Sequence, residues 1–291
     1  MEQFRNIGLI GRRGSAKVLD SVRQLKDFLL SKHLNVILEE DTAESLPGHH
    51  QQVSAKKMLG EVCDLVIVVG GDGCMLGAAR ALVKSDVPVL GINRGRLGFL
   101  TDISPDEIEQ KVEEVLNGQF TSETRFLLDA VVKREGHTMG CADALNDVVL
   151  HSGKSKRMIE FELYIDGQFV YSQRSDGMIL ATPTGSTAYA LSGGGPIMHP
   201  SLDAIVLVPM FPHTLSSRPI VVGGNSEIKI VISNNNEVYP HLSFDGQGAI
   251  TTAPGDCITI SKKVRKLRLI HPLNHNFYET CRSKLGWGTK L

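Results

Sequence analysis

The sequence of 291 residues contains no hydrophobic run long enough to cross a lipid bilayer. Its longest apolar stretches, at 65–69 and 205–208, are far shorter than the roughly 20 residues that a membrane-spanning helix requires. The N-terminus carries Glu2 and Arg5 and lacks the apolar core of a signal peptide. We therefore expect a soluble, cytoplasmic protein that has no membrane partner.

Paired cysteines are also lacking. The five cysteines stand far apart and form no C-x-x-C pair, which argues against a disulfide framework and against a zinc knuckle. His271 and His275 are four residues apart, but no glutamate lies between them and no third ligand is evident. We expect these two histidines, and the adjacent His49 and His50, to be surface or packing residues, and we assign no metal ligands.

An excess of either charge is the third absence. Lys and Arg number 31 and Asp and Glu number 32, so the formal net charge is −1. This balance argues against a protein that coats nucleic acid, and we expect no nucleic-acid partner. The hydrophobic share of 42% is that of an ordinary globular protein, and the length suggests about two domains.

Residues 1–120 alternate between strand-like and helix-like segments. The run 64–69 (DLVIVV) is apolar after its first residue and β-branched, as in strands that are buried on both faces of a parallel sheet. A helix is predicted where apolar residues recur at spacings of three and four, at Val18, Val22, Leu25 and Leu29. Further strands are predicted at 6–10, 35–38 and 87–92, and a further helix at 75–83. This βαβ pattern predicts an α/β domain with an open, mostly parallel sheet.

One more helix of this domain has recognisable ends. Ser104 and Glu107 have the spacing of a capping box, and Pro105 stands at the first helical position. Gly118 stands where a helix C-cap is expected. We therefore predict a helix between these two signals.

Residues 121–268 have a different pattern. Apolar residues alternate with polar ones over 160–165, Asp166 and Gly167 follow, and 168–172 is again strand-like, which predicts a β-hairpin with a type I′ turn. Strands are also predicted at 227–232 and 257–260. We expect an antiparallel, β-rich second domain, followed by a tail at 269–291 that contains a helix and packs back on the first domain.

Glycine is concentrated at 70–73 (GGDG), 91–98 (GINRGRLG) and 177–195. The first cluster lies between a buried-type strand and a helix, where open α/β sheets bind ligands and where glycine lets backbone N–H groups approach phosphate. Of the four Asp-Gly pairs, only Asp166–Gly167 lies between two alternating runs. For Asp72 we therefore favour a ligand loop over a plain turn.

Two common nucleotide-binding motifs are absent. Gly153-Lys154-Ser155 resembles the end of a P-loop, but Val148 stands where the motif needs glycine. The Rossmann fingerprint fails because the glycine after Gly73 comes one residue too late, at Gly77. A carboxylate at Asp72 suits a general base, or a ligand of phosphate-bound Mg²⁺, better than phosphate binding alone.

The segment 182–192 (TPTGSTAYALS) is rich in hydroxyl groups, which can bind a nucleotide, and Tyr189 offers a face for base stacking. A Ser/Thr turn at a sheet end explains the composition equally well. Asn146 and Asp147 precede an apolar strand and could hold ribose hydroxyls or cap a loop. Three other charged residues are, taken singly, typical of ordinary surface: Arg157, Arg174 and Asp176.

Together these segments resemble the NAD kinase family over most of the chain. The resemblance rests on GGDG at 70–73, NRGRLGFLTD at 93–102, LNDVVLH at 145–151, DGMILATPTGSTAYALSGGGP at 176–196, SSRP at 216–219 and FDGQ at 244–247. GGDG also occurs in diacylglycerol-kinase-like and phosphofructokinase-like proteins, whereas the long Thr/Gly/Ser segment is highly specific. The resemblance implies an N-terminal α/β domain, a β-rich C-terminal domain and a returning tail. It also implies transfer of the ATP γ-phosphoryl group to the 2′-hydroxyl of the adenosine ribose of NAD, giving NADP and ADP.

The resemblance further implies roles for individual residues. Asp72 resembles the proton acceptor for the 2′-hydroxyl, with Gly73 beside it. The loop around the adenosine corresponds to Thr187, Ala188, Tyr189, Ala190, Leu191 and Ser192, with Tyr189 beside the base. Further positions around the dinucleotide are Asn146, Asp147, Arg157, Arg174, Asp176 and Gln247. An arginine at the position of Arg174 is associated in the family with preference for NAD over NADH.

The sequence departs from the family pattern at three positions. Position 147 holds Asp where Glu is usual, so this side chain reaches less far, and Cys74 and Ala190 stand where polar residues are common. We expect NAD and ATP as substrates, Mg²⁺ with the ATP phosphates, and a homodimer or homotetramer.

Two other functions stay open at this point. One is a kinase of another GGDG-type substrate, a lipid or a sugar, and the other is a non-catalytic protein that senses dinucleotides. A sensor does not need a carboxylate in its phosphate loop, and a lipid kinase should carry an apolar acceptor groove in place of TPTGSTAY.

Overall fold

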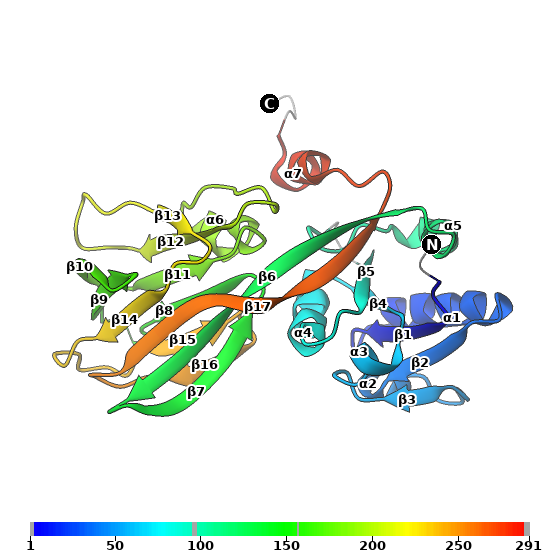
Figure 1. Ribbon diagram of the computed structural model, residues 1–291, viewed down its shortest axis with the longest axis horizontal. Helices are drawn as coiled ribbons and strands as arrows, with labels where there is room; N and C mark the ends of the chain where they lie inside the picture. Colours follow the sequence, from blue (N-terminus) through cyan, green and yellow to red (C-terminus); the bar gives the residue numbers. More distant parts are fainter. Residues whose placement is uncertain (1–2, 95–97, 156, 288–291) are drawn as a thin grey trace. The chain divides into compact units, whose positions relative to one another are not determined.

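The computed structural model describes residues 3–94, 98–155 and 157–287 (Figure 1). The chain forms two compact units, one made of residues 1–124 together with 266–291, and one made of 125–265. We call them the α/β unit and the β unit. The division inferred from the sequence lies at 120/121, where strand β6 (Phe120–Arg134) begins, and at 268/269, inside strand β17 (Cys257–Pro272). Both strands continue from one unit into the other.

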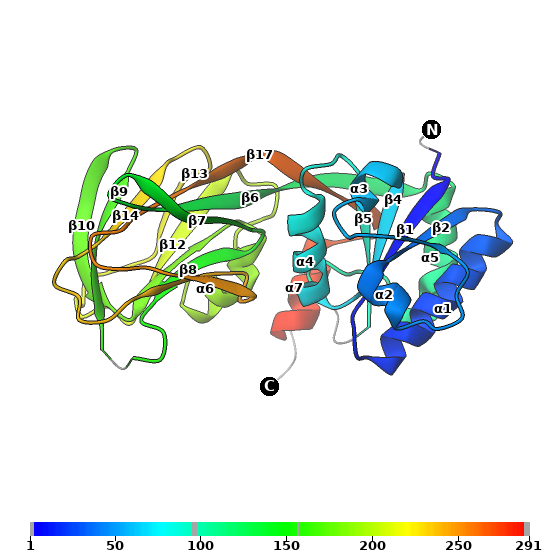
Figure 2. The same cartoon turned by 90° about the horizontal axis from the view of Figure 1, so that it is seen from below.

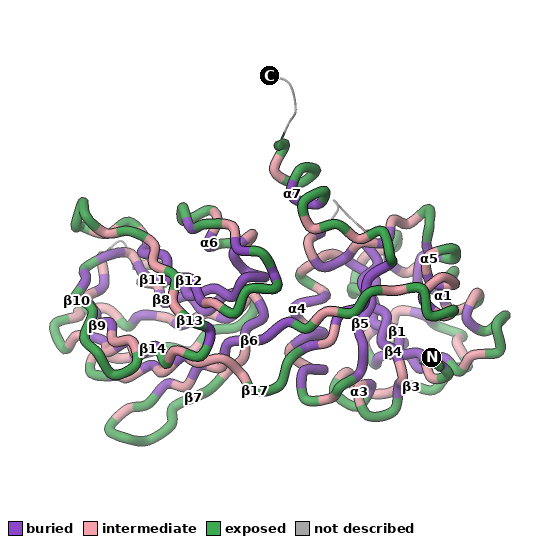
Figure 3. The backbone as a smooth tube through the Cα atoms, turned by 45° about the horizontal axis from the view of Figure 1, so that its top comes forward, coloured by how far each residue is buried: buried purple, intermediate pink, exposed green. Residues whose placement is uncertain are grey.

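The α/β unit is built on a parallel sheet with the strand order β17-β5-β4-β1-β2-β3. Its other strands are β1 (Asn6–Gly11), β2 (Asn35–Glu39), β3 (Gln52–Ser54), β4 (Leu65–Gly70) and β5 (Pro88–Asn93). Every residue of β4 and β5 is buried, as Figure 3 shows by colour. The prediction of an open, mostly parallel sheet is therefore confirmed.

Helices cover both faces of this sheet (Figure 2). Apolar residues of α1 and α5 pack with alternate residues of the strands, such as Leu9, Ile67 and Leu90, in one core cluster. The opposite face carries α3 and α4, whose Leu59 and Met75 lie over Gly8 and Gly91. The helices of this unit are α1 (Ala16–Ser31), α2 (Glu40–Glu44), α3 (Leu59–Val62), α4 (Asp72–Leu82), α5 (Ile108–Leu116) and α7 (Phe277–Leu285).

Two helix starts differ from the prediction. Helix α4 begins at Asp72 rather than at residue 75, so GGDG is not a separate loop: Gly70 ends β4, Gly71 is the N-cap, and Asp72 and Gly73 begin the helix. The predicted capping box is wrong, because the side chain of Ser104 makes no capping hydrogen bond. Residues 105–107 form a 3₁₀ turn before α5, whose C-terminal Gly118 has the positive φ of +80° expected of a C-cap glycine.

The β unit consists of two sheets whose described pairs within the unit are antiparallel. One has the order β13-β12-β11-β8-β15-β16, and the other contains β10-β9-β14-β17 with β6 and β7. A shared apolar core includes Leu150 and Leu180 of the first sheet and Phe161 and Ile230 of the second. The strands not yet given are β7 (His137–Ala144), β8 (Asp147–His151), β9 (Ile159–Ile165), β10 (Gln168–Ser175), β11 (Gly177–Ala181), β12 (Ala204–Met210), β13 (Ile220–Gly223), β14 (Ile228–Ile232), β15 (His241–Phe244) and β16 (Gly248–Thr251).

The predicted hairpin at Asp166–Gly167 is confirmed, with positive φ at both turn residues. A second Asp-Gly hairpin was not predicted: Asp245 and Gly246 also have positive φ and connect β15 to β16. These two strands are only four residues long, too short to show an alternating pattern. None of the described helices is both long and apolar enough to span a membrane.

Candidate active site

Asp72 lies at the carboxyl end of β4. Gly70 ends the strand, Gly71 is the N-cap of α4 and Asp72 is its first residue. The sheet has the strand order β5-β4-β1-β2. From β1 the chain adds β2 on one side and later β4 and β5 on the other, so the order in which strands are added reverses between β1 and β4. Open α/β sheets bind ligands at this point, beyond the carboxyl ends of the strands.

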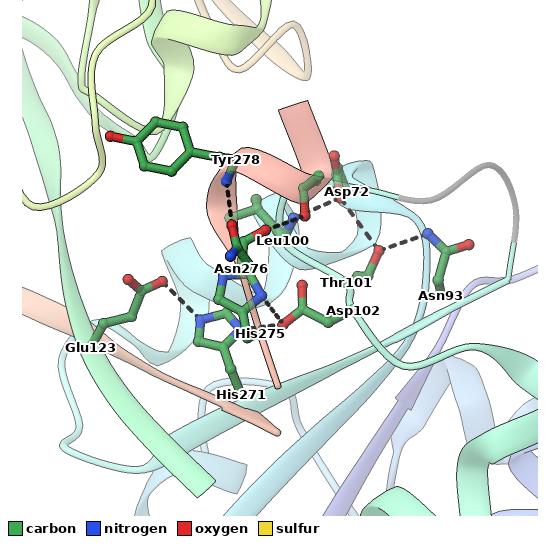
Figure 4. A network of polar contacts seen from close by, with 11 residues as sticks. Asp72, Asn93, Leu100, Thr101, Asp102, Glu123, His271, His275, Asn276 and Tyr278 are labelled. Carbon is green, nitrogen blue, oxygen red and sulfur yellow. Dashed lines mark hydrogen bonds and ion pairs between the residues drawn. The ribbon is translucent and has the colours of Figure 1, made fainter. Parts of the chain in front are cut away.

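Both carboxylate oxygens of Asp72 are held by the segment 98–102, which follows β5 (Figure 4). The backbone N–H of Phe99 donates to Oδ2 at 2.9 Å, and that of Leu100 donates to Oδ1 at 3.1 Å. The hydroxyl of Thr101 lies 3.4 Å from Oδ1 and accepts a hydrogen bond from Asn93 Nδ2 at 3.0 Å. These contacts fix the orientation of the carboxylate.

Glycine makes this close approach possible. A Cβ atom at Gly98 would lie 2.0 Å from Asp72 Oδ1, and one at Gly91 would lie 2.4 Å from the carbonyl oxygen of Leu100. Both glycines belong to the second glycine cluster of the sequence. Residues 95–97 of that cluster and of the NRGRLGFLTD motif lie outside the described residues.

The same segment ends in a buried charge network. Asp102 Oδ2 lies in hydrogen-bond contact with Nδ1 of His271, and 3.2 Å from Nδ1 of His275. His271 Nε2 lies 2.8 Å from Oε1 of Glu123, and the two imidazole rings stack with their centroids 4.1 Å apart. His271 is only 3% exposed.

The network sets the charge of its members. Burial alone would lower the pKa of His271, but its hydrogen bonds to Asp102 and Glu123 outweigh burial and raise the pKa to about 9. Burial would likewise raise the pKa of Asp102, and the hydrogen bonds from His271 and His275 instead hold it well below its ordinary value. At neutral pH His271 is therefore an imidazolium that is hydrogen-bonded to Asp102 and Glu123.

This arrangement decides between the two alternatives, surface or packing, for His271. The sequence offers no third ligand near them, whereas the fold brings in Asp102, whose donor atom lies within 4.8 Å of theirs. His271 is also no surface residue. Both of its ring nitrogens contact carboxylates, so its hydrogen bonding is satisfied without a metal ion.

A second group of predicted residues lines a cavity of about 620 Å³ in the β unit. It contains five of the expected positions: Asn146, Asp147, Asp176, Ala188 and Tyr189. The cavity is also lined by residues that were not predicted as site residues, including His151, Ser243 and Asp245.

Asp245 organises one wall of this cavity. Its carboxylate accepts hydrogen bonds from the backbone N–H groups of Leu145, Asn146 and Asp147, at 3.2, 2.8 and 3.3 Å. Asp147 is 5% exposed. Its burial and the nearby charge of Asp245 raise the pKa of Asp147 to about 7, opposed by a hydrogen bond from the backbone of Tyr189. The only sequence signal for Asp245 was its place in the FDGQ motif.

The hydroxyl groups of the TPTGST segment mostly bond to backbone carbonyls. Thr182 Oγ1 donates to Leu145 O at 2.6 Å, Ser186 Oγ to Pro183 O at 2.7 Å, and Thr187 Oγ1 to Thr184 O at 3.2 Å. They shape a 3₁₀ turn at 185–187 that leads into helix α6 (Tyr189–Ser192). This was the alternative interpretation of their composition.

The remaining predicted residues lie in and beside helix α6 or outside the cavity of Asp147. Ala190 is buried against the outer face of the β8-β11-β12 sheet, and Tyr189 is 46% exposed. Arg157 and Arg174 line a separate cavity of about 760 Å³ with Glu160 and His213. The structure does not bring these arginines into the cavity of Asp147. Seven expected positions are not among the residues that line either cavity: Asp72, Gly73, Thr187, Ala190, Leu191, Ser192 and Gln247.

Comparison with known proteins identifies the family. The model of the ATP-NAD kinase N-terminal domain matches residues 7–120, and that of the ATP-NAD kinase C-terminal domain matches 145–272. This chain belongs to the NAD kinase family. The predicted resemblance and the predicted two-domain fold are confirmed.

Individual members of the NAD kinase family are similar over the whole length. The NAD kinase of Pseudomonas fluorescens (strain Pf0-1) is 72% identical over 291 residues, which cover 100% of this chain and 98% of that protein. The NAD kinase of Pseudomonas syringae pv. tomato is 71% identical, with the same coverage.

Two solved structures of the NAD kinase family share the fold. Yeast NADH kinase, complexed with NADH, aligns with a TM-score of 0.90 at 27% identity, over 99% of this chain and 89% of that one. An NAD kinase from Archaeoglobus fulgidus, in complex with ATP, aligns with a TM-score of 0.73 at 27% identity, over 96% and 99%.

Proposed function

We propose that this chain transfers the γ-phosphoryl group of ATP to the 2′-hydroxyl of the adenosine ribose of NAD, giving NADP and ADP. Membership of the NAD kinase family supports the reaction. The main structural support is the carboxylate of Asp72, which two backbone amides hold at the carboxyl end of β4. It supports Asp72 as the residue that takes part in the reaction.

Asp72 acts as the general base in this proposal. An alcohol becomes a better nucleophile when a positioned carboxylate accepts its proton as the oxygen attacks phosphorus. The amides of Phe99 and Leu100 occupy one side of each carboxylate oxygen. Oδ1 also has the Thr101 hydroxyl at 3.4 Å, whereas Phe99 is the donor to Oδ2 among the described residues. Because a carboxylate oxygen has two acceptor positions, the second position of Oδ2 can accept the proton of the 2′-hydroxyl.

Mg²⁺ enters with ATP in this proposal, as part of the nucleotide substrate. It binds proteins through one or two carboxylates together with substrate phosphates and water, and neutralises phosphate charge there. Asp72 fits this pattern as a single carboxylate at the sheet edge. Among the described residues, Asp102, His271 and His275 bring potential ligand atoms close together. This set of one carboxylate and two imidazoles does not resemble a Mg²⁺ site, because Mg²⁺ prefers oxygen ligands.

The cavity of the β unit provides the dinucleotide contacts. We assign ribose hydroxyls to Asn146 and Asp147 and the adenine face to Tyr189, which is half exposed beside them. We also assign dinucleotide contacts to the other family positions: Gly73, Arg157, Arg174, Asp176, Thr187, Ala188, Ala190, Leu191, Ser192 and Gln247. A lipid acceptor is disfavoured because this cavity is lined by three carboxylates, those of Asp147, Asp176 and Asp245.

The deciding experiment incubates purified protein with ATP, Mg²⁺ and NAD and measures NADP with an NADP-specific dehydrogenase. We expect NADP in proportion to enzyme and time, and none when Mg²⁺ is replaced by EDTA. Folded protein that binds NAD but forms no NADP would instead support the dinucleotide sensor. The cytoplasmic location and the homodimer or homotetramer stay predictions, and sedimentation tests the latter.

A further inference from the structure

We infer that Asp102 and His271 are positioning residues for phosphoryl transfer, because they hold the segment 98–102 that in turn holds the carboxylate of Asp72 (Figure 4). The inference rests on the proposed role of Asp72 as general base. In this inference both residues act on the reaction through the segment 98–102.

The segment contacts Asp72 at its beginning and the histidines at its end. Phe99 and Leu100 donate their backbone N–H groups to the two carboxylate oxygens of Asp72. Only two residues later, Asp102 contacts the imidazoles of His271 and His275. A shift of Asp102 therefore moves the two amides that orient Asp72.

The partner of Asp102, His271, is fixed by the pairing of β17 with β5. His271 lies on β17, whose Leu269 and Ile270 pair with Val89 and Leu90 of β5 in parallel register. The ring of Phe277, at the start of α7, lies 6.4 Å from that of Phe99. The segment that follows β5 is thus anchored to a strand that pairs with β5 itself.

The charged hydrogen bonds of Asp102, His271 and Glu123 are better suited to orienting the segment 98–102 than to stabilising the fold. Burying an imidazolium with carboxylates costs desolvation, and apolar residues of similar volume often stabilise a fold as well or better. A network of charge-assisted hydrogen bonds has defined directions, which apolar packing lacks. This arrangement suits a segment whose amides must point at one carboxylate.

A matched pair of variants separates positioning from packing. The amide nitrogen of His271→Asn can take the place of Nδ1 and keep the bond to Asp102, whereas that of His271→Gln reaches the place of Nε2, toward Glu123. We expect His271→Gln to lower kcat at least tenfold, with KM for ATP and NAD within twofold of the parent. His271→Asn should retain more than a third of the parental kcat.

A purely structural role gives a different result. Both variants would then lower the melting temperature while the folded fraction kept the parental kcat, or both would lose kcat equally. Either outcome overturns the inference.

Hydrogen exchange provides a readout that does not depend on activity. In Asp102→Asn we expect the amides of Phe99 and Leu100 to exchange at least tenfold faster than in the parent, while those of β11 keep their protection. Unchanged exchange at these two amides overturns the inference even if kcat falls. If the parent itself forms no NADP, the proposed function fails, and the exchange rates still decide whether Asp102 holds the segment.

Discussion

The two units hold their site carboxylates in different ways. In the α/β unit, backbone amides fix Asp72, and Gly98 lets them approach. In the β unit, Asp147 is buried near Asp245, and its pKa is raised to about 7. A carboxylate in one fixed orientation suits the chemical step, whereas one that titrates near neutrality binds according to its charge. The comparison predicts that changes in the first region alter kcat and changes in the second alter NAD affinity.

The largest effect is expected at Asp72. Asp72→Asn is nearly isosteric, but it cannot accept a proton as a carboxylate does, and its NH₂ group replaces the acceptor of one of the two bonds from Phe99 and Leu100. We expect kcat to fall by about 10²–10⁴-fold or more, while the fold and NAD binding are largely kept. The measurement is steady-state kinetics beside calorimetric titration of NAD. Turnover within threefold of the parent would remove the general-base assignment, and a change mainly in KM would mean that Asp72 contributes uniform binding.

A methyl group at Gly98 tests the fixed orientation without removing the carboxylate. Gly98→Ala places Cβ against Asp72 Oδ1, so the segment or the carboxylate must move. We expect a loss of kcat on the order of 10²-fold, the effect of about 1 Å of misplacement. The control is Gly223→Ala, whose new Cβ has its nearest neighbour 3.9 Å away. Equal kcat in the two variants would contradict the role of close approach.

The affinity for NAD should depend on pH through Asp147. Ribose hydroxyls donate hydrogen bonds, and an ionised acceptor binds them more strongly, by about 1 kcal/mol or roughly fivefold in Kd. We therefore expect NAD to bind more tightly at pH 8 than at pH 6, measured by calorimetry. Asp147→Asn, which keeps His151 and His241 in place, should remove this difference. A pH dependence that survives in the variant assigns it to another group.

The same shift has a consequence for stability. The pKa of Asp147 is near 3.8 in the unfolded chain and about 7 in the folded one, so the folded state holds the proton more tightly. This stabilisation is full below about pH 4 and is lost as pH rises through about 7. The melting temperature of the parent relative to Asp147→Asn should fall over this window. A constant difference would contradict the raised pKa.

The smallest effect is expected at Arg174. This side chain lines the second cavity with Arg157, apart from the cavity of Asp147. Following the family pattern, we expect Arg174→Gly to raise the ratio of NADH to NAD activity severalfold, with little loss of turnover on NADH. The measurement compares kcat/KM for the two dinucleotides. An unchanged ratio removes Arg174 from the specificity argument.

The sequence predicts the features that depend on neighbouring residues. The buried strand β4 follows from its apolar run, and the turn at Asp166–Gly167 follows from two alternating flanks. Strand β17 was predicted only over 257–260, because the charged residues of 261–268 interrupt the apolar pattern. Such strands form when pairing with neighbours outweighs the local composition.

Contacts between distant residues explain what the sequence analysis missed. Asp102 and His271 are 169 positions apart, so no spacing rule connects them. Asp245 acts on Leu145, Asn146 and Asp147 across about a hundred positions. Composition also cannot show that Thr182 and Ser186 bond to backbone carbonyls, since the same hydroxyls would equally serve a ligand.

The continuation of β17 from one unit into the other has a consequence for synthesis on the ribosome. The β unit is one uninterrupted stretch of chain, whereas the sheet of the α/β unit needs residues that are translated before 125 and after 265. While the intervening stretch emerges, β5 lacks the partner that its Val89 and Leu90 will pair with. An unpaired edge strand is a site for chaperones and for aggregation. The half of the molecule that begins first is therefore completed last.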